Sequence, residues 1–259
     1  MSASTRFQIG VYAGNPNGND AAAEASFESN FNSFVAATGG AKPTTMNAFT
    51  DFGQNPSQWS SNAGWTSWSW AKSPVVGTST TPIIGIPMSD NAHWAGNAAG
   101  WTNDDFFNGV INGTYDADYK GIVDAWANHG FKTMELRVGY EMDGGFMPWF
   151  MGEDASTQSD WVKAFQHLST LMRGEAKADG VTAKIVWNPA DINWSNQSVQ
   201  GTYPGDAYVD VISTDAYSPL YPKDLYDWAK NDGTVDMSAQ HWAANPINRQ
   251  HFWSYPNAN

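Results

Sequence analysis

The sequence lacks cysteine altogether over its 259 residues. Disulfide bonds, cysteine-ligated metal sites and thiol nucleophiles are therefore excluded. No apolar run approaches the ~20 residues that a membrane-spanning helix requires. Basic residues are also scarce, because 13 Lys and Arg stand against 26 Asp and Glu, and the formal net charge is −13. This negative charge argues against nucleic acid or an anionic membrane surface as a binding partner.

The sequence also lacks the motifs of several large enzyme classes. It contains no His-Glu-x-x-His zinc motif, no phosphate-binding loop, no Gly-x-Gly-x-x-Gly and no Gly-x-Ser-x-Gly. We therefore expect neither a metal nor a cofactor. The first residues, from Met1 to Arg6, contain no apolar signal-peptide core. The protein is therefore either cytoplasmic or extracellular with a signal peptide that is not present in this sequence, and the weakly charged, Asn-rich composition favours the second.

Short apolar or alternating segments follow one another along the chain, separated by segments of helical periodicity. This succession predicts parallel strands joined by crossover helices. The strands are expected at Phe7–Tyr12, Thr44–Phe49, Thr81–Met88, Thr133–Glu141, Ala183–Pro189 and Tyr208–Tyr217. The helices are expected at Ala21–Thr38, Tyr115–Gly130, Asp160–Ala178 and Lys223–Lys230. The pattern therefore predicts a (β/α) barrel of class α/β, as one domain over residues 1–259, with six strands recognisable.

The segment from Gln54 to Ser73 combines many Ser and Asn residues with four of the 14 tryptophans of the chain. We interpret it as an ordered excursion over the barrel. Its tryptophans either pack inside the protein or contact a ligand. Packing is favoured, because large aromatic side chains are mostly buried.

A carboxylate stands at the end of the fourth expected strand. One set of alternating residues comprises Met134, Leu136, Val138 and Tyr140, and the other comprises Glu135, Arg137, Gly139 and Glu141, just before the turn sequence Met-Asp-Gly-Gly. The first set is expected to face the helices, and Glu135 is expected to pair with Arg137 inside the barrel. Residues at the carboxyl ends of barrel strands are the ones that carry catalysis.

Glu141 is therefore the best candidate for a general acid, with an exposed loop carboxylate as the alternative. Phe146 and Trp149 follow it closely and offer apolar faces on which sugar rings stack. Asp215 ends the sixth strand and is a possible second carboxylate, although an Asp that caps the following loop is equally compatible with the pattern. His93 lies on the loop after the third strand and is a candidate substrate contact.

Three ordered motifs resemble those of glycoside hydrolase family 26. The first is Arg137-Val-Gly-Tyr-Glu-Met-Asp-Gly-Gly-Phe-Met-Pro-Trp149. The second is Lys184-Ile-Val-Trp-Asn-Pro189, and the third is Tyr203-Pro-Gly-Asp-Ala-Tyr-Val-Asp-Val-Ile-Ser-Thr-Asp-Ala-Tyr217. Members of this family are retaining, endo-acting β-glycanases, chiefly β-mannanases with some lichenases and xylanases. The resemblance is strongest from Tyr115 to Tyr217.

The resemblance implies that Glu141 is the acid/base and that Tyr217 hydrogen-bonds the nucleophile. It implies further substrate-binding positions at Arg137, Tyr140, Phe146, Trp149 and Asn188. Tyr140 stands where the mannanases have His, Asp143 where they have Asn, and Phe146 where they have Trp. These departures put mannan specificity in doubt more than they affect the fold.

The family nucleophile is a Glu at the end of the seventh strand, and this sequence contains no Glu after Glu175. The resemblance therefore implies a fold of the (β/α)8 TIM-barrel type that is incomplete at its C-terminus, with the last two strands missing. Pairing with another chain is expected to be possible at the open edge. The predicted function is retaining hydrolysis of a β-linked polysaccharide such as β-mannan, β-glucan or xylan. The alternative is a catalytically impaired carbohydrate-binding remnant, and the chain alone is expected to be weakly active or inactive.

Overall fold

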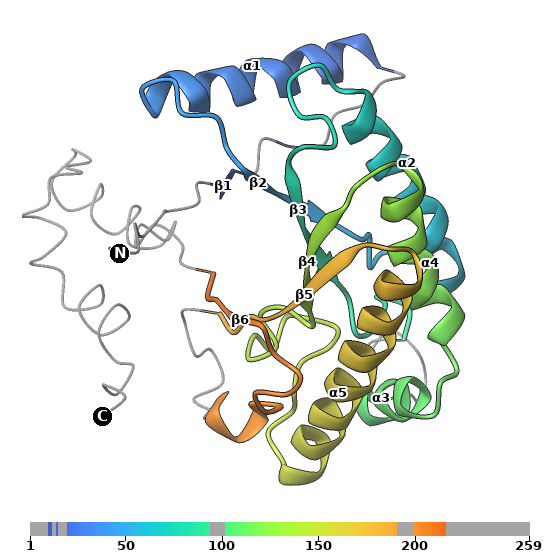
Figure 1. Cartoon of the computed structure of the whole chain (residues 1–259). Coiled ribbons are helices and arrows are strands. Elements are labelled where there is room, and N and C mark those ends of the chain that lie inside the picture. The colour runs from blue at the N-terminus through green and yellow to red at the C-terminus, as the bar shows by residue number, and fades with distance from the viewer. Residues whose placement is uncertain (1–9, 12–13, 15–19, 94–101, 191–198, 216–259) are drawn as a thin grey trace, which may run out of the picture.

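Six parallel strands form a single sheet that follows the order of the sequence (Figure 1). The computed structural model describes residues 10–11, 14, 20–93, 102–190 and 199–215. The strands are β1 (Gly10–Val11), β2 (Thr45–Phe49), β3 (Thr81–Ile86), β4 (Thr133–Val138), β5 (Thr182–Trp187) and β6 (Val211–Ile212). Each strand pairs in parallel with the next, so the predicted succession of βα units is confirmed.

Helices cover one face of this sheet. They are α1 (Ala21–Ala37), α2 (Pro56–Lys72), α3 (Asn103–Ile111), α4 (Asp116–Asn128) and α5 (Ala155–Ala178), and a 3-10 turn, η1, spans Val199–Thr202. In Figure 1, α2, α4 and α5 lie side by side along the sheet, and α2 packs against α4 while α4 packs against α5. The expected helix at Lys223–Lys230 lies outside the described residues. No helix in the described part of the chain combines the length and apolarity that a membrane-spanning helix requires.

The segment that was expected to be an excursion over the barrel is instead helix α2. Asn55 opens the helix with a capping box, and Pro56 occupies its first turn, where a missing N–H costs nothing. Trp59 and Trp70 are fully buried on one side of the helix. Trp70 meets Trp126 of α4 edge-on, with ring centroids 5.2 Å apart. Burial of this apolar side outweighs the weak helix propensity of the Ser and Asn residues. The expected packing role is confirmed for Trp59 and Trp70, whereas Trp65 is 44% exposed.

Helix α5 begins five residues before its predicted start at Asp160. Asp154 caps it, because its carboxylate accepts hydrogen bonds from the backbone N–H groups of Ser156 and Thr157, each at 2.9 Å. The predicted apolar stripe is confirmed, since all four of its members are fully buried: Trp161, Phe165, Leu168 and Met172. Helix α3, which Thr102 caps, was not anticipated from the sequence.

The end of β4 departs from the predicted alternation. Met134, Leu136 and Val138 are buried under the helices as expected. Gly139 then adopts a positive φ of 53°, a left-handed conformation that interrupts the extended strand. The side chain of Tyr140 consequently lies beside Arg137 rather than with the helix-facing set. The prediction that Tyr140 faces the helices is therefore wrong.

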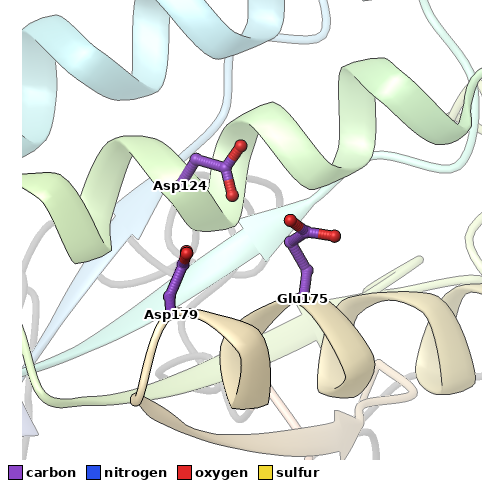
Figure 2. Close-up of side chains that lie close together, drawn as sticks. All are labelled: Asp124, Glu175 and Asp179. Atoms are coloured by element: carbon purple, nitrogen blue, oxygen red, sulfur yellow. The ribbon is translucent and has the colours of Figure 1, made fainter.

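Polar side chains join α4 to α5 on the outside of the protein. Figure 2 shows Asp124 of α4 pointing toward Glu175 of α5 and Asp179 at the end of α5. Lys120 pairs with Glu175 at 2.9 Å. Burial, followed by the charges of Asp179 and Glu175, raises the pKa of Asp124 to about 6, and the charge of Lys120 opposes this shift only in part. Near neutral pH the cluster therefore holds more negative charge than one lysine can offset.

We predict that Asp124→Asn stabilises the protein at neutral pH. The folded-state pKa of about 6 lies above the value of ~3.9 in the unfolded chain, so the contribution of Asp124 to stability is fully present below pH ~4 and is lost as the pH rises through about 6. The carboxylate is partly solvated, which reduces the effect to about 1 kcal/mol, or about 2–4 °C in Tm. Thermal unfolding as a function of pH measures it. Glu153→Gln on an exposed residue is the control, and an Asp124→Asn variant with the wild-type pH profile would contradict the prediction.

We also predict that Gly139→Ala destabilises the protein by about 2–4 kcal/mol, from left-handed backbone strain together with overpacking. A Cβ atom at this position would lie 2.5 Å from Met88 Sδ and 3.2 Å from Trp161 Cζ2. The matched control is Gly174→Ala in α5, where a Cβ meets nothing within 4 Å and a gain of up to about 1 kcal/mol is expected. Urea denaturation of both variants gives the comparison, and equal stabilities would refute the role assigned to Gly139.

Candidate active site

A pocket of about 960 Å³ opens at the carboxyl ends of the strands. This size lies at the upper end of the ~300–1,000 Å³ found for ligand sites. Its walls come from the end of β2 and the loop after it, from α2, from the end of β4 and from the chain that follows β6. The lining residues are Asn47, Phe49, Thr50, Asp51, Phe52, Asn62, Thr66, Arg137, Tyr140, Glu141, Met147, Thr214 and Asp215.

Arg137 and Asp215 form an ion pair in the wall of this pocket. Arg137 Nη2 donates to Asp215 Oδ2 at 2.9 Å, and the arginine side chain is only 7% exposed. The guanidinium also lies 4.9 Å from the ring centroid of Tyr140 and 5.6 Å from that of Phe49. A weakly hydrated guanidinium favours such aromatic contacts. The pair joins the end of β4 to the residues after β6.

Glu135 does not pair with Arg137, contrary to the sequence-based expectation. It lies opposite Lys184 in the register of β4 and β5, and the closest Nζ–Oε1 distance is 3.8 Å. Arg137 is two residues further toward the carboxyl end of β4, where Asp215 is available. The buried guanidinium therefore pairs with a carboxylate in the chain after β6, in the wall of the pocket.

Glu141 is held in an unusual backbone conformation. Its φ is 53°, and it is the one non-glycine residue in the described part of the chain with a positive φ. Its N–H donates to the carbonyl of Asn188 at 2.7 Å, and its carbonyl accepts from the N–H of Gly144 at 2.9 Å. Residues in the left-handed region cost ~1–3 kcal/mol and cluster at functional sites. This strain, together with 3% exposure and a position on the pocket wall, makes Glu141 the leading candidate for a functional carboxylate.

Tyr140 lines the same pocket and remains neutral. Burial raises its pKa well above the usual value, and the charge of Arg137 only partly opposes the shift. A neutral phenol can donate and accept hydrogen bonds. The ring of Tyr140 packs edge-on against that of Trp149, with centroids 4.8 Å apart. The buried Trp149 thus fixes the position of the Tyr140 ring.

Trp149 and Asn188 are buried behind the pocket rather than lining it. Trp149 is fully buried, its Nε1–H donates to the carbonyl of Tyr140, and its ring contacts Phe52 edge-on. It therefore offers no face to a sugar in this structure, and the predicted stacking role is wrong. Asn188 is 1% exposed and acts through its backbone carbonyl, which holds the N–H of Glu141. Both residues position the pocket wall.

Two further predicted site residues lie outside the pocket lining, and a third is not among the described residues. Phe146 is 51% exposed and does not line the pocket. His93 also lies outside the pocket lining, where its Nδ1 contacts both oxygens of the buried Asp90 at 2.7 Å. Tyr217 lies outside the described residues. The structure thus brings together four of the predicted residues in one pocket, namely Arg137, Tyr140, Glu141 and Asp215.

Sequence reasoning missed the wall formed by β2 and α2. Asp51, Asn62 and Thr66 line the pocket, and Asn62 and Thr66 are one helical turn apart on α2. This spacing was the available signal, and it was lost because the segment was not recognised as a helix. One group of three carboxylates within the described residues could hold a metal ion, and it is the α4–α5 cluster of Figure 2, on residues that do not line the pocket.

Comparison with known proteins identifies relatives of one family. Residues 134–231 match the family model of glycosyl hydrolase family 26. Endoglucanase H of Acetivibrio thermocellus is 34% identical over 113 residues, which is 42% of this chain and 12% of that protein. Two solved structures from Bacillus subtilis superpose with a TM-score of 0.53 each: the YdhT protein, at 16% identity, and mannanase man26, at 18% identity.

Each of the two superpositions covers 80% of this chain, and they cover 62% of the YdhT protein and 63% of man26. The chain thus spans less than two thirds of the length of these relatives. The structural neighbours support the TIM-barrel type of fold, in agreement with the parallel order of β1 to β6. The matched region contains Arg137, Glu141 and Asp215, three of the residues that line the pocket. The region from 134 to 231 therefore resembles glycosyl hydrolase family 26.

Proposed function

We propose that this chain binds a neutral β-linked glycan in the pocket and that Glu141 is the acid/base of a retaining, endo-acting glycosidase. The observation that carries the proposal is the strained, nearly buried carboxylate of Glu141 on the wall of a large pocket that also contains aromatic rings. Glycoside hydrolysis needs a proton donor for the leaving oxygen and a second carboxylate on the other side of the sugar ring. Aromatic rings and paired polar groups hold the ring in place.

In the proposed mechanism, Glu141 protonates the glycosidic oxygen as the bond breaks and then takes a proton from the attacking water. Asp215 is engaged by Arg137 at 2.9 Å, so we assign it to positioning Arg137 rather than to nucleophilic attack. Arg137 Nε has no hydrogen-bond partner among the described residues, and a sugar hydroxyl could supply one. A covalent route requires a carboxylate ~5–5.5 Å from Glu141, and we leave that role to another residue.

The substrate is proposed to be a β-mannan, β-glucan or xylan. Relatives described as a mannanase and an endoglucanase support this class. Polymers of this kind lie outside the cell, which supports an extracellular location for the protein. Pairing with another chain at the edge strands β1 and β6 stays a prediction. A catalytically impaired glycan-binding protein is the competing outcome, and the engagement of Asp215 by Arg137 is what favours it.

The first test is Glu141→Gln, which keeps the shape of the side chain and removes the acid. Whatever turnover the 259-residue chain has on β-mannan, β-glucan and xylan should fall ~100- to 10,000-fold, while binding of the corresponding oligosaccharides persists. Reducing-end release measures turnover, and isothermal titration calorimetry measures binding. Glu28→Gln on α1 is the control. Undiminished turnover in Glu141→Gln would remove Glu141 from the mechanism, and retained binding without turnover in the wild type would favour the binding protein.

The second test is Asp215→Ala, which leaves the buried guanidinium of Arg137 without its partner. The free energy of unfolding should fall by about 3 kcal/mol, because an uncompensated buried charge is costly. Asp160→Ala is the matched control, because it breaks the exposed pair with Lys163 and should cost less than about 1 kcal/mol. Urea denaturation compares them. A covalent glycosyl intermediate mapped to Asp215 by mass spectrometry would overturn its positioning role and make it the nucleophile.

A further inference from the structure

The pocket has a second end that the proposed chemistry does not use. Glu141, Arg137 and Asp215 lie at the ends of β4 and β6, whereas Asp51 and Asn62 belong to the loop after β2 and to α2. The aromatic residues Phe49, Phe52 and Tyr140 also line the pocket. With a volume of about 960 Å³, the pocket exceeds what a single sugar ring at Glu141 would fill.

Asp51 and Asn62 are oriented by hydrogen bonds to the backbone. The N–H of Asp51 donates to Asn62 Oδ1 at 3.3 Å, and the N–H of Gly53 donates to Asp51 Oδ1 at 2.8 Å. The first bond identifies which side-chain atom of Asn62 is the oxygen, since only an acceptor can face an N–H group. The Nδ2 amide of Asn62 is therefore available as a donor, and the second oxygen of Asp51 as an acceptor.

A donor beside an acceptor matches the chemistry of a sugar. Each sugar hydroxyl both donates and accepts a hydrogen bond, so a carboxylate oxygen and an amide N–H group together can satisfy adjacent hydroxyls. The rings of Phe49 and Phe52 offer apolar contact to the C–H face of a pyranose. The lining contains three carboxylates, those of Asp51, Glu141 and Asp215, against the single guanidinium of Arg137. This balance favours a neutral sugar over a uronic acid.

We infer that Asp51 and Asn62 form a specificity subsite that binds a neutral sugar unit of the same glycan, one or more units from the bond that Glu141 protonates. The inference rests on the proposed function, because it takes the occupant of the pocket to be a glycan. In this subsite, Asp51 Oδ2 accepts a hydrogen bond from one sugar hydroxyl and Asn62 Nδ2 donates one to the adjacent hydroxyl. It contributes to the binding of chains long enough to reach it and contributes nothing to shorter ones.

The test measures oligosaccharide binding to the full chain carrying Glu141→Gln, by calorimetry with β-1,4-linked manno- and gluco-oligosaccharides from disaccharide to hexasaccharide. Asn62→Ala should weaken binding of the longer members by about 3- to 10-fold, the loss expected for one or two neutral hydrogen bonds. Binding of the disaccharide should not change. Asn32→Ala on α1, which replaces an exposed Asn outside the pocket, is the control.

A second variant separates contact with the sugar from a structural role. Asn62→Asp keeps the oxygen that accepts the N–H of Asp51 but replaces the donor that faces the sugar. It should therefore lose as much affinity as Asn62→Ala, whereas recovery of wild-type affinity would show that only the loop contact matters and would overturn the inference. Equal affinities of wild type and Asn62→Ala for the hexasaccharide would overturn it as well. If no β-linked oligosaccharide binds to the wild type, the proposed function itself fails, and the inference fails with it.

Discussion

The buried ion pair between Arg137 and Asp215 is the interaction on which the pocket depends. Burying the guanidinium of Arg137, which is 7% exposed, costs much free energy unless an opposite charge lies beside it. The opposite charge is the carboxylate of Asp215, 78 positions later in the chain. The aromatic rings of Phe49 and Tyr140 then surround the pair from β2 and from the end of β4. One electrostatic requirement thus fixes the relative positions of three segments whose side chains form the wall of the site.

The left-handed backbone conformation after β4 is the second feature that shapes the pocket. Gly139 and Glu141 both have φ values of 53°, and Tyr140 lies between them. The turn places Tyr140 and Glu141 on the same pocket, whereas uninterrupted strand alternation would separate them. Trp149 and the carbonyl of Asn188 hold this turn from behind through hydrogen bonds to Tyr140 and Glu141. Trp149 and Asn188, which the sequence predicted as substrate-binding residues, therefore position their neighbours Tyr140 and Glu141.

Much of the fold follows from local pattern, whereas much of the site does not. The helix stripe from Trp161 to Met172 and the alternation from Met134 to Val138 were predictable, because burial imposes their periodicity directly. Helix α2 was missed because its Ser and Asn residues conceal a stripe that only tertiary packing stabilises. The partners of Arg137 and the burial of Trp149 depend on the path of distant segments, and a single sequence carries no pattern for that path.

The sequential order of the strands has a consequence for how the protein forms during synthesis. Because β1 to β6 pair in the order in which they leave the ribosome, each βα unit can dock on the one before it without waiting for distant chain. Arg137 emerges early, and Asp215 follows only after β5 and α5 have been made. Until then the guanidinium lacks the partner with which it forms the ion pair. The helix-covered side of the sheet can therefore consolidate first, and the pocket acquires its final form as one of the last steps of folding.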